Sequence, residues 1–176
     1  MSIFVFTEER VTPQLDASFF GCNGHKIALK TQYNSHKYIQ ALGDRRFVNV
    51  NGASTDKGIV FEVEDYGVNA TTKARIIALK SIYKNYLSAS DCKNPTDPSN
   101  PECNVSAHSS YVWDGAKFEV KHNQNNQYWF QTHWTLKDSS GHVKHLYLMP
   151  HLDGYLRGDG TQYDLRRWGK FTPECF

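Results

Sequence analysis

Residue types that could support catalysis are sparse in this 176-residue chain. Cys22 and His25 lie three positions apart, as a nucleophile and its base can, but they fall in a predicted turn with no acid placed to orient the histidine. The chain also lacks a Gly-x-Ser-x-Gly motif and a glycine-rich phosphate loop. We therefore expect a protein that is not an enzyme.

A second chemical possibility is a metal site built from histidines. His142 and His145 form a His-x-x-His motif, and His151 follows downstream. Zinc sites use such nitrogens when three or four ligands converge on rigid elements. On a β-strand, side chains three positions apart point to opposite faces, so these two histidines would not converge. We expect surface histidines, with no metal and no cofactor.

The cysteines and the glycosylation motifs bear on whether the protein is cytoplasmic or secreted. Cys92 and Cys103 bracket the proline-containing segment 91–102 and could close it as a disulfide, which would be worth roughly 2–3 kcal/mol. Asn69 and Asn104 begin N-glycosylation motifs, which suit a secreted protein. The N-terminal residues show no basic region followed by a long apolar run, so we expect a cytoplasmic protein, with secretion as the alternative.

Composition limits the classes of partner. Lys and Arg (20) nearly balance Asp and Glu (18), which argues against broad binding of nucleic acid, because that needs a concentrated positive field. No segment approaches the roughly 18 apolar residues of a transmembrane segment. With 39% hydrophobic and 14% aromatic residues, the chain is expected to form a single folded domain over 1–176.

One sequence motif recurs along the chain. KIALKTQYNSHKYIQA at 26–41 returns as RIIALKSIYKNYLSAS at 75–90, and HLYLMPHLDGYLRG at 145–158 is interpreted as a diverged third copy. Each copy is followed by a closing phrase centred on a phenylalanine, namely Phe61, Phe118 and Phe171. The chain is therefore predicted to hold three units of about fifty residues. Their approximate bounds are 20–66, 67–122 and 123–176.

Each unit is predicted to consist of about four short β-strands. Apolar and polar residues alternate with a period of two, and turn dipeptides separate the alternating runs. Three all-β units that must bury their apolar faces against one another predict a β-trefoil, a six-stranded barrel capped by three hairpins. The predicted core comprises Ile27, Leu29, Phe61, Ile77, Leu79, Phe118, Leu146, Leu148 and Phe171.

The phrases IALKTQ…KYIQA with FEVE, and IALKS…NYLSAS with KFEV, resemble the fascin-like and hisactophilin-like β-trefoils. The resemblance covers most of 20–171 and lies mainly in core and turn residues, so it specifies the fold better than the function. It implies binding to actin filaments. The chain departs from the hisactophilin type because its eight histidines do not form dense clusters.

If the trefoil symmetry holds, three equivalent turns lie at one end of the barrel and could form a mildly basic, partly pH-responsive face toward acidic actin or anionic lipid. Polar turns are also expected simply because they are solvated. The residues predicted to bind the partner are His36, Lys37, Lys84, Asn85, His151 and Asp153.

A carbohydrate-binding lectin is the alternative prediction. Gln127 and Trp129 form a Gln-x-Trp phrase that resembles the one in ricin-type lectins, and lectins bind sugars through a carboxylate or amide beside an aromatic ring. Two sets could serve, namely Asp153 with Tyr155, or Asp159 with Tyr163 and Trp168. A third class, a protease inhibitor acting through the loop 91–102, is also kept.

Overall fold

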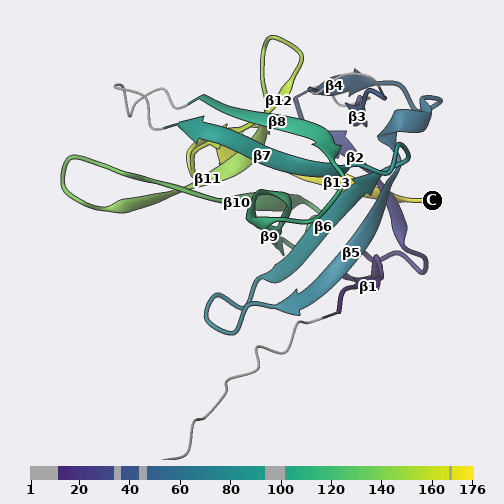
Figure 1. Cartoon of the computed structure of the whole chain (residues 1–176), viewed down its shortest axis with the longest axis horizontal. Helices are drawn as coiled ribbons and strands as arrows, with labels where there is room; N and C mark the ends of the chain where they lie inside the picture. The colour runs from purple at the N-terminus through teal and green to yellow at the C-terminus, as the bar shows by residue number, and fades with distance from the viewer. Residues whose placement is uncertain (1–11, 34–36, 44–46, 94–101, 167) are drawn as a thin grey trace, which may run out of the picture.

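The structure is a computed structural model that describes residues 12–33, 37–43, 47–93, 102–166 and 168–176. In these ranges every regular element is a β-strand or a three-residue 3-10 helix, which confirms the predicted all-β class (Figure 1). Neighbouring strands pair antiparallel. None of the helical segments in the described ranges has the length and apolar character needed to cross a bilayer.

Six strands pair with one another in a closed ring. They are β2 (Lys26–Thr31), β5 (Phe61–Val68), β6 (Arg75–Ser81), β9 (Phe118–His122), β10 (Tyr128–Lys137) and β13 (Phe171–Cys175). Each strand of this set pairs with two others, in the order β2, β5, β6, β9, β10 and β13, and β13 returns to β2. The short β1 (Gln14–Leu15) pairs with β5 outside the ring.

Three hairpins are attached to this ring. They are β3 (Tyr38–Ala41) with β4 (Val48–Gly52), β7 (Tyr86–Lys93) with β8 (Glu102–Ser109), and β11 (Val143–Pro150) with β12 (Leu156–Gly160). The hairpins also touch one another through three backbone pairs, Arg157 with Asn104, Phe47 with Ser106, and Asn49 with Tyr155. The four 3-10 helices are η1 (Ser18–Phe20), η2 (Lys57–Ile59), η3 (Asp114–Ala116) and η4 (Asp164–Arg166).

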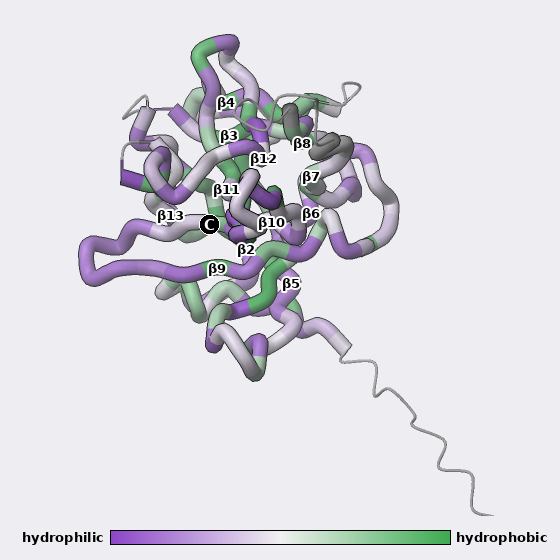
Figure 2. Tube along the Cα trace, turned by 90° about the vertical axis from the view of Figure 1, so that its left-hand side faces the viewer, coloured by the Kyte–Doolittle hydropathy of each residue, from purple (hydrophilic) through white to green (hydrophobic). Residues whose placement is uncertain are grey.

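The hydrophobic core fills the space inside the ring and hairpins. All nine residues predicted for the core are at most 1% exposed, so this prediction is confirmed. Phe118 and Phe171 both contact the ring of Phe130, with centroids 6.3 and 5.8 Å away. Figure 2 shows the hydrophobic stretches mostly in the strands and the hydrophilic ones mostly in the outlying loops. Each fully buried large apolar side chain contributes about 1.5–3 kcal/mol.

The structure corrects the predicted third copy of the repeat. The segment 145–158 was matched to 75–90, but it spans β11 and β12 rather than a ring strand and the strand after it. The true counterpart of β2 and β6 is β10, since Tyr128 pairs with Phe171 as Ile27 pairs with Phe61. The prediction failed because aromatic residues in β10 replace the aliphatic residues of the first two copies. The predicted unit bounds stay a prediction.

A disulfide that was not predicted joins the two ends of the described chain. Cys22 lies just before β2, and Cys175 lies in β13, which pairs with β2. The Cα atoms are 5.4 Å apart although the residues are separated by 153 positions. Cys103 is also disulfide-bonded. The side chain of Cys92 lies outside the described part of the structure, so the pairing of Cys92 with Cys103 stays a prediction.

Candidate functional site

Of the residues predicted to bind a filament, Lys37, Lys84 and Asn85 lie in turns between a ring strand and a hairpin strand. Lys37 precedes β3, and Lys84 lies in the β6–β7 turn with its Nζ 3.8 Å from Glu62. Asn85 accepts a backbone hydrogen bond from Ser81 in the same turn. His36 lies outside the described residues.

The third predicted turn differs, because 151–154 joins β11 to β12, whereas the other two turns lead from a ring strand into a hairpin. The expected symmetry of the three loops, which relied on the third copy, is therefore wrong.

The two histidines of the His-x-x-His motif have different neighbours and do not converge on one site. His142 Nδ1 lies 3.5 Å from Asp138, and His145 Nδ1 lies 3.1 Å from the side-chain nitrogen of Gln131.

The residues predicted to bind sugar are partly brought together. Asp153 and Tyr155 line one hollow of about 170 Å³. Tyr163 lines a different hollow, and Trp168 packs edge-on against Tyr33 with ring centroids 5.2 Å apart. Asp159 is largely buried on β12, where its Oδ2 lies 3.9 Å from His151 Nε2. The first predicted pair therefore shares a site, whereas the members of the second set have different surroundings.

A hollow with a volume of about 610 Å³ lies along the β7–β8 hairpin. We call it the serine groove, and its lining consists of Phe47, Ser88, Ser90, Asn104, Ser106, His108, Ser109, Ser110, Tyr111 and Trp113. Its floor is a row of polar residues facing each other across the two strands, because Ser88 pairs with Ser106 and Ser90 pairs with Asn104. Alternation along a strand places these residues on one face, while neighbours such as Leu87 and Val105 point into the core.

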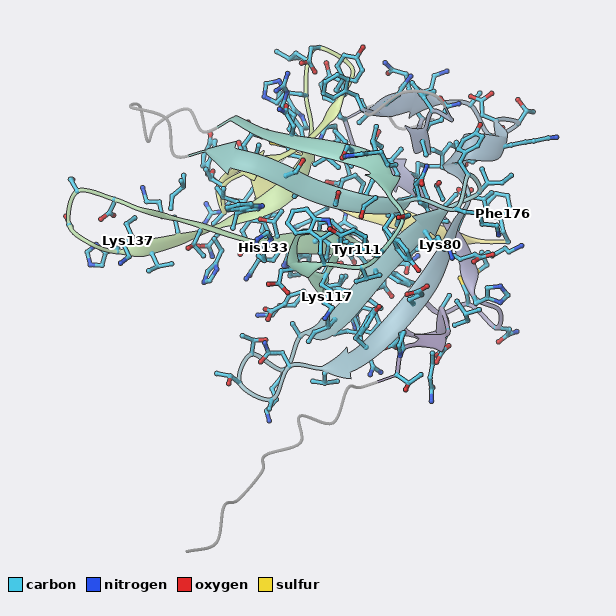
Figure 3. All side chains as sticks on the ribbon, in the orientation of Figure 1. Lys80, Tyr111, Lys117, His133, Lys137 and Phe176 are labelled. Carbon is cyan, nitrogen blue, oxygen red and sulfur yellow. A yellow bond between two sulfur atoms is a disulfide. The ribbon has the colours of Figure 1, made fainter. Side chains whose placement is uncertain are left out.

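Aromatic rings form the sides of the serine groove. Phe47 is 48% exposed and Tyr111 is 67% exposed, so both present their faces to solvent. Trp113 lies directly over Gly115, where a Cβ atom would come within 2.2 Å of the indole, and it meets His133 edge-on at 5.8 Å. Tyr111 and His133 are labelled in Figure 3, where both lie below β7. Burial lowers the pKa of His133, so this neighbour of Trp113 favours its neutral form.

The hollow that contains Asp153 adjoins the serine groove. We call it the Asp153 hollow, and its lining consists of Phe47, Asn104, Asp153, Tyr155, Leu156 and Arg157. Phe47 and Asn104 also line the serine groove, so the two hollows are adjacent, and together we call them the depression. The rings of Phe47 and Tyr155 lie 5.5 Å apart at an interplanar angle of 54°.

Asp153 is held in a defined orientation. Arg157 Nη2 donates a hydrogen bond to Asp153 Oδ2 at 2.5 Å, and the backbone N–H of Tyr155 donates to Oδ1 at 3.1 Å. Partial desolvation opposes ionisation, but the bonds from Arg157 and Tyr155 outweigh it and lower the pKa of Asp153. An oriented carboxylate beside an exposed ring can accept hydrogen bonds from ligand hydroxyls while the ring packs against carbon.

Sequence reasoning found Asp153 and Tyr155 but missed most of the depression. The missed residues are Phe47, Ser88, Ser90, Asn104, Ser106, His108, Ser109, Ser110, Tyr111, Trp113, Leu156 and Arg157. The run NVSAHSSYVW at 104–113 carried a usable signal, because polar and apolar residues alternate over 104–108 and two aromatic residues, Tyr111 and Trp113, follow. Nothing local to Phe47 in the sequence indicates that it pairs with β8 and meets Tyr155.

The comparisons with known proteins bear on the fold and not on the function. No protein-family model matches the chain, and no curated protein matches its sequence. Among solved structures, one that it resembles is described as "Structure and mode of action of a mosquitocidal holotoxin", with a TM-score of 0.57 and 14% sequence identity. The match covers 86% of this chain but only 16% of that longer chain. At this identity the likeness shows a shared fold alone.

Proposed function

We propose that the chain is a β-trefoil that binds carbohydrate through the Asp153 hollow and the serine groove. The trefoil is supported by the closed ring of six antiparallel strands and by the three hairpins that touch one another. The likeness to one part of a mosquitocidal holotoxin supports the same fold. The resemblance to fascin-like proteins rests on core and turn residues and supports no more than this.

The observation that carries the proposal is the arrangement around Asp153. A sugar ring has hydroxyls at its edge and an apolar face of C–H groups, so it needs polar acceptors and an aromatic surface at the same place. The hollow offers the oriented Asp153 carboxylate, the Asn104 amide and the Phe47–Tyr155 ring pair within about 170 Å³. That volume suits one sugar ring better than an extended ligand.

The serine groove extends the site beyond one ring. Its cross-strand polar row, its exposed Tyr111 and its partly buried Trp113 provide hydroxyl partners and stacking surfaces along the hairpin. The two hollows are adjacent at Phe47 and Asn104, so a ligand anchored at Asp153 needs to pass only these two residues to extend toward Trp113. We therefore propose an oligosaccharide as the ligand, with its terminal residue in the Asp153 hollow.

The proposal includes binding without catalysis and action outside the cytoplasm. Asp153 is the one acidic residue among the described residues that line the depression, and it is paired with Arg157. The disulfide between Cys22 and Cys175 supports the secreted alternative, because such bonds persist in oxidising compartments. Actin filaments and a protease target of loop 91–102 stay untested predictions, and residues 94–101 of that loop lie outside the described structure.

A glycan array followed by calorimetric titration of the best ligand tests this function. We expect Asp153→Asn and Tyr155→Ala each to weaken binding by roughly tenfold or more, since each removes a charged acceptor or a stacking ring. Tyr83→Ala is the matched control, because Tyr83 is an exposed tyrosine outside both hollows. Absence of glycan binding, together with salt-sensitive co-sedimentation with actin filaments, would overturn the proposal.

A further inference from the structure

The outer surfaces of the ring strands carry equivalent residue pairs in the three units, and those of the third unit differ from the other two. In the first unit Lys30 lies opposite Tyr38, and Ala28 lies opposite Glu174. The second unit repeats this with Lys80 opposite Tyr86 and Ala78 opposite Glu64. In the third unit the corresponding pairs are Gln131 with Tyr147 and Trp129 with Lys121. The tyrosine is kept, while the alanine becomes tryptophan, the glutamate becomes lysine and the lysine becomes glutamine.

In the first two units these positions form a closed structural cluster. The hydroxyl of Tyr38 donates to Glu174 at 2.6 Å, and the hydroxyl of Tyr86 donates to Glu64 at 2.6 Å. The two tyrosines are 5% and 7% exposed, and each packs over the small alanine of its unit. The tyrosine, its carboxylate partner and the alanine therefore fill this part of the surface.

In the third unit the same positions are open. Tyr147 makes no side-chain hydrogen bond to any described residue, because a lysine stands where the carboxylate would be. A hollow of about 350 Å³ lies here, between the outer face of β9–β10–β11 and the connection from β12 to β13. We call it the basic hollow, and its lining consists of Glu119, Lys121, Trp129, Gln131, Tyr147, Gln162, Leu165, Arg166 and Lys170.

The basic hollow carries positive charge that the protein itself does not neutralise. Among the described residues, Lys121, Arg166 and Lys170 form no ion pair. Lys170 Nζ lies 5.7 Å from the centroid of the Trp129 ring. The acid in the lining, Glu119, accepts hydrogen bonds on both of its oxygens from side chains of the turn after β5, Asn69 and Thr72. Three cations therefore face one acid that is already engaged.

We propose that the basic hollow binds an acidic sugar, a ring that carries a sulfate or carboxylate group. Lys121, Arg166 and Lys170 supply charge-assisted donors for the anion, and Trp129 with Tyr147 supplies aromatic surface for the ring. The amides of Gln131 and Gln162 can bind its hydroxyls. The volume lies at the lower end of the 300–1,000 Å³ or so of small-molecule sites, which fits one ring rather than a polymer groove.

This site is independent of the proposed carbohydrate site. The basic hollow shares no lining residue with the serine groove or the Asp153 hollow. The two proposals can therefore fail separately, and a variant of one hollow serves as a control for the other. A chain with both sites would bind a glycan through a neutral segment and an acidic segment at different places on its surface.

Titration calorimetry with galactose-6-sulfate, glucuronate, galactose and inorganic sulfate tests the assignment. We expect both acidic sugars to bind at least about tenfold more tightly than galactose, and binding to weaken between about 50 and 300 mM NaCl. Lys121→Glu, which introduces the residue type of the other two units, should reduce acidic-sugar binding by roughly tenfold or more. Lys137→Gln is the matched control, since Lys137 lies at the far end of the β10–β11 hairpin (Figure 3).

Each remaining outcome contradicts the proposal. Equal binding of galactose and its sulfate ester would show that charge is not recognised. If inorganic sulfate bound as tightly as the sulfated sugar, the basic hollow would be a simple anion site that does not recognise the sugar ring. Loss of acidic-sugar binding in Asp153→Asn, with no change in Lys121→Glu, would move the ligand to the Asp153 hollow. Thermal unfolding of each variant checks that the fold is retained.

Discussion

Tyr38 and Tyr147 occupy the same register position in the first and third units but have different surroundings. The hydroxyl of Tyr38 donates to Glu174, which also pairs with Lys30, whereas Tyr147 faces a hollow lined with cations. The ring strands below them keep the same pairing, because Phe61 and Phe171 occupy matching places opposite Ile27 and Tyr128. The buried face therefore fixes the fold, while substitutions on the outer face change a structural cluster into an open surface.

The largest effect is expected from removing the disulfide beside the closed cluster of the first unit. Cys22→Ala with Cys175→Ala should lower the free energy of unfolding by about 3–5 kcal/mol, since the bond closes a very long loop across the β2–β13 pair. Urea denaturation of the variant and of the oxidised wild type measures this. A change below about 1 kcal/mol would mean that the ring pairing alone holds the ends together.

Exchanging the residue beneath the tyrosine tests whether the closed cluster has room for the third unit's tryptophan. Ala28 is fully buried with Tyr38 and Ile59, so Ala28→Trp should overpack the cluster and lower the free energy of unfolding by about 2–3 kcal/mol. The reciprocal Trp129→Ala should reduce stability less and remove acidic-sugar binding. If Ala28→Trp left the free energy of unfolding unchanged in thermal and urea denaturation, the closed cluster would have room for a tryptophan. The outer surfaces of the first and third units would then differ less than we infer.

Exchanging the charge beside the tyrosine should have a smaller effect in both units. Glu174→Lys leaves the Tyr38 hydroxyl without its acceptor and places two lysines together, so we expect a loss of about 1–2 kcal/mol. Lys121→Glu should change stability by no more than about 0.5 kcal/mol, because Lys121 is exposed and forms no ion pair with a described residue. Equal effects of the two substitutions in urea denaturation would contradict a structural role limited to Glu174.

The smallest expected effect is a difference in pH dependence. Hydrogen bonds from Lys30 and then from Tyr38 lower the pKa of Glu174 below its ordinary value of 4.5. A lowered carboxyl pKa adds stability above the unfolded-state value and loses it as the pH falls through the folded-state value. Wild type should therefore lose more stability than Glu174→Gln between about pH 6 and pH 3. Solvent screening keeps this difference small, because the Glu174 side chain is 37% exposed. Parallel curves in thermal unfolding would count against it.

The sequence predicted the buried face better than the surface, for a physical reason. Ile27, Leu79 and Phe118 reveal their burial by alternation within one strand, which is a local signal. The hollows depend on residues that come together only after long-range pairing, such as Phe47 with Ser106. Asp153 and Tyr155 were predictable because they are neighbours in one turn, whereas Lys121 and Lys170 become neighbours only when β13 returns to β10.

The bond between Cys22 and Cys175 also determines how the protein responds to mechanical tension. When the chain is pulled at positions outside the bond, the shortest covalent path for the load runs through the two sulfur atoms. Once the short pairing of β1 with β5 has parted, the strands between Cys22 and Cys175 are bypassed by that path. The segment between Cys22 and Cys175, which are 153 positions apart, adds no length until the bond is reduced. Both proposed sugar sites lie inside this shielded loop, so end-to-end tension would leave their geometry intact until a reductant releases the loop.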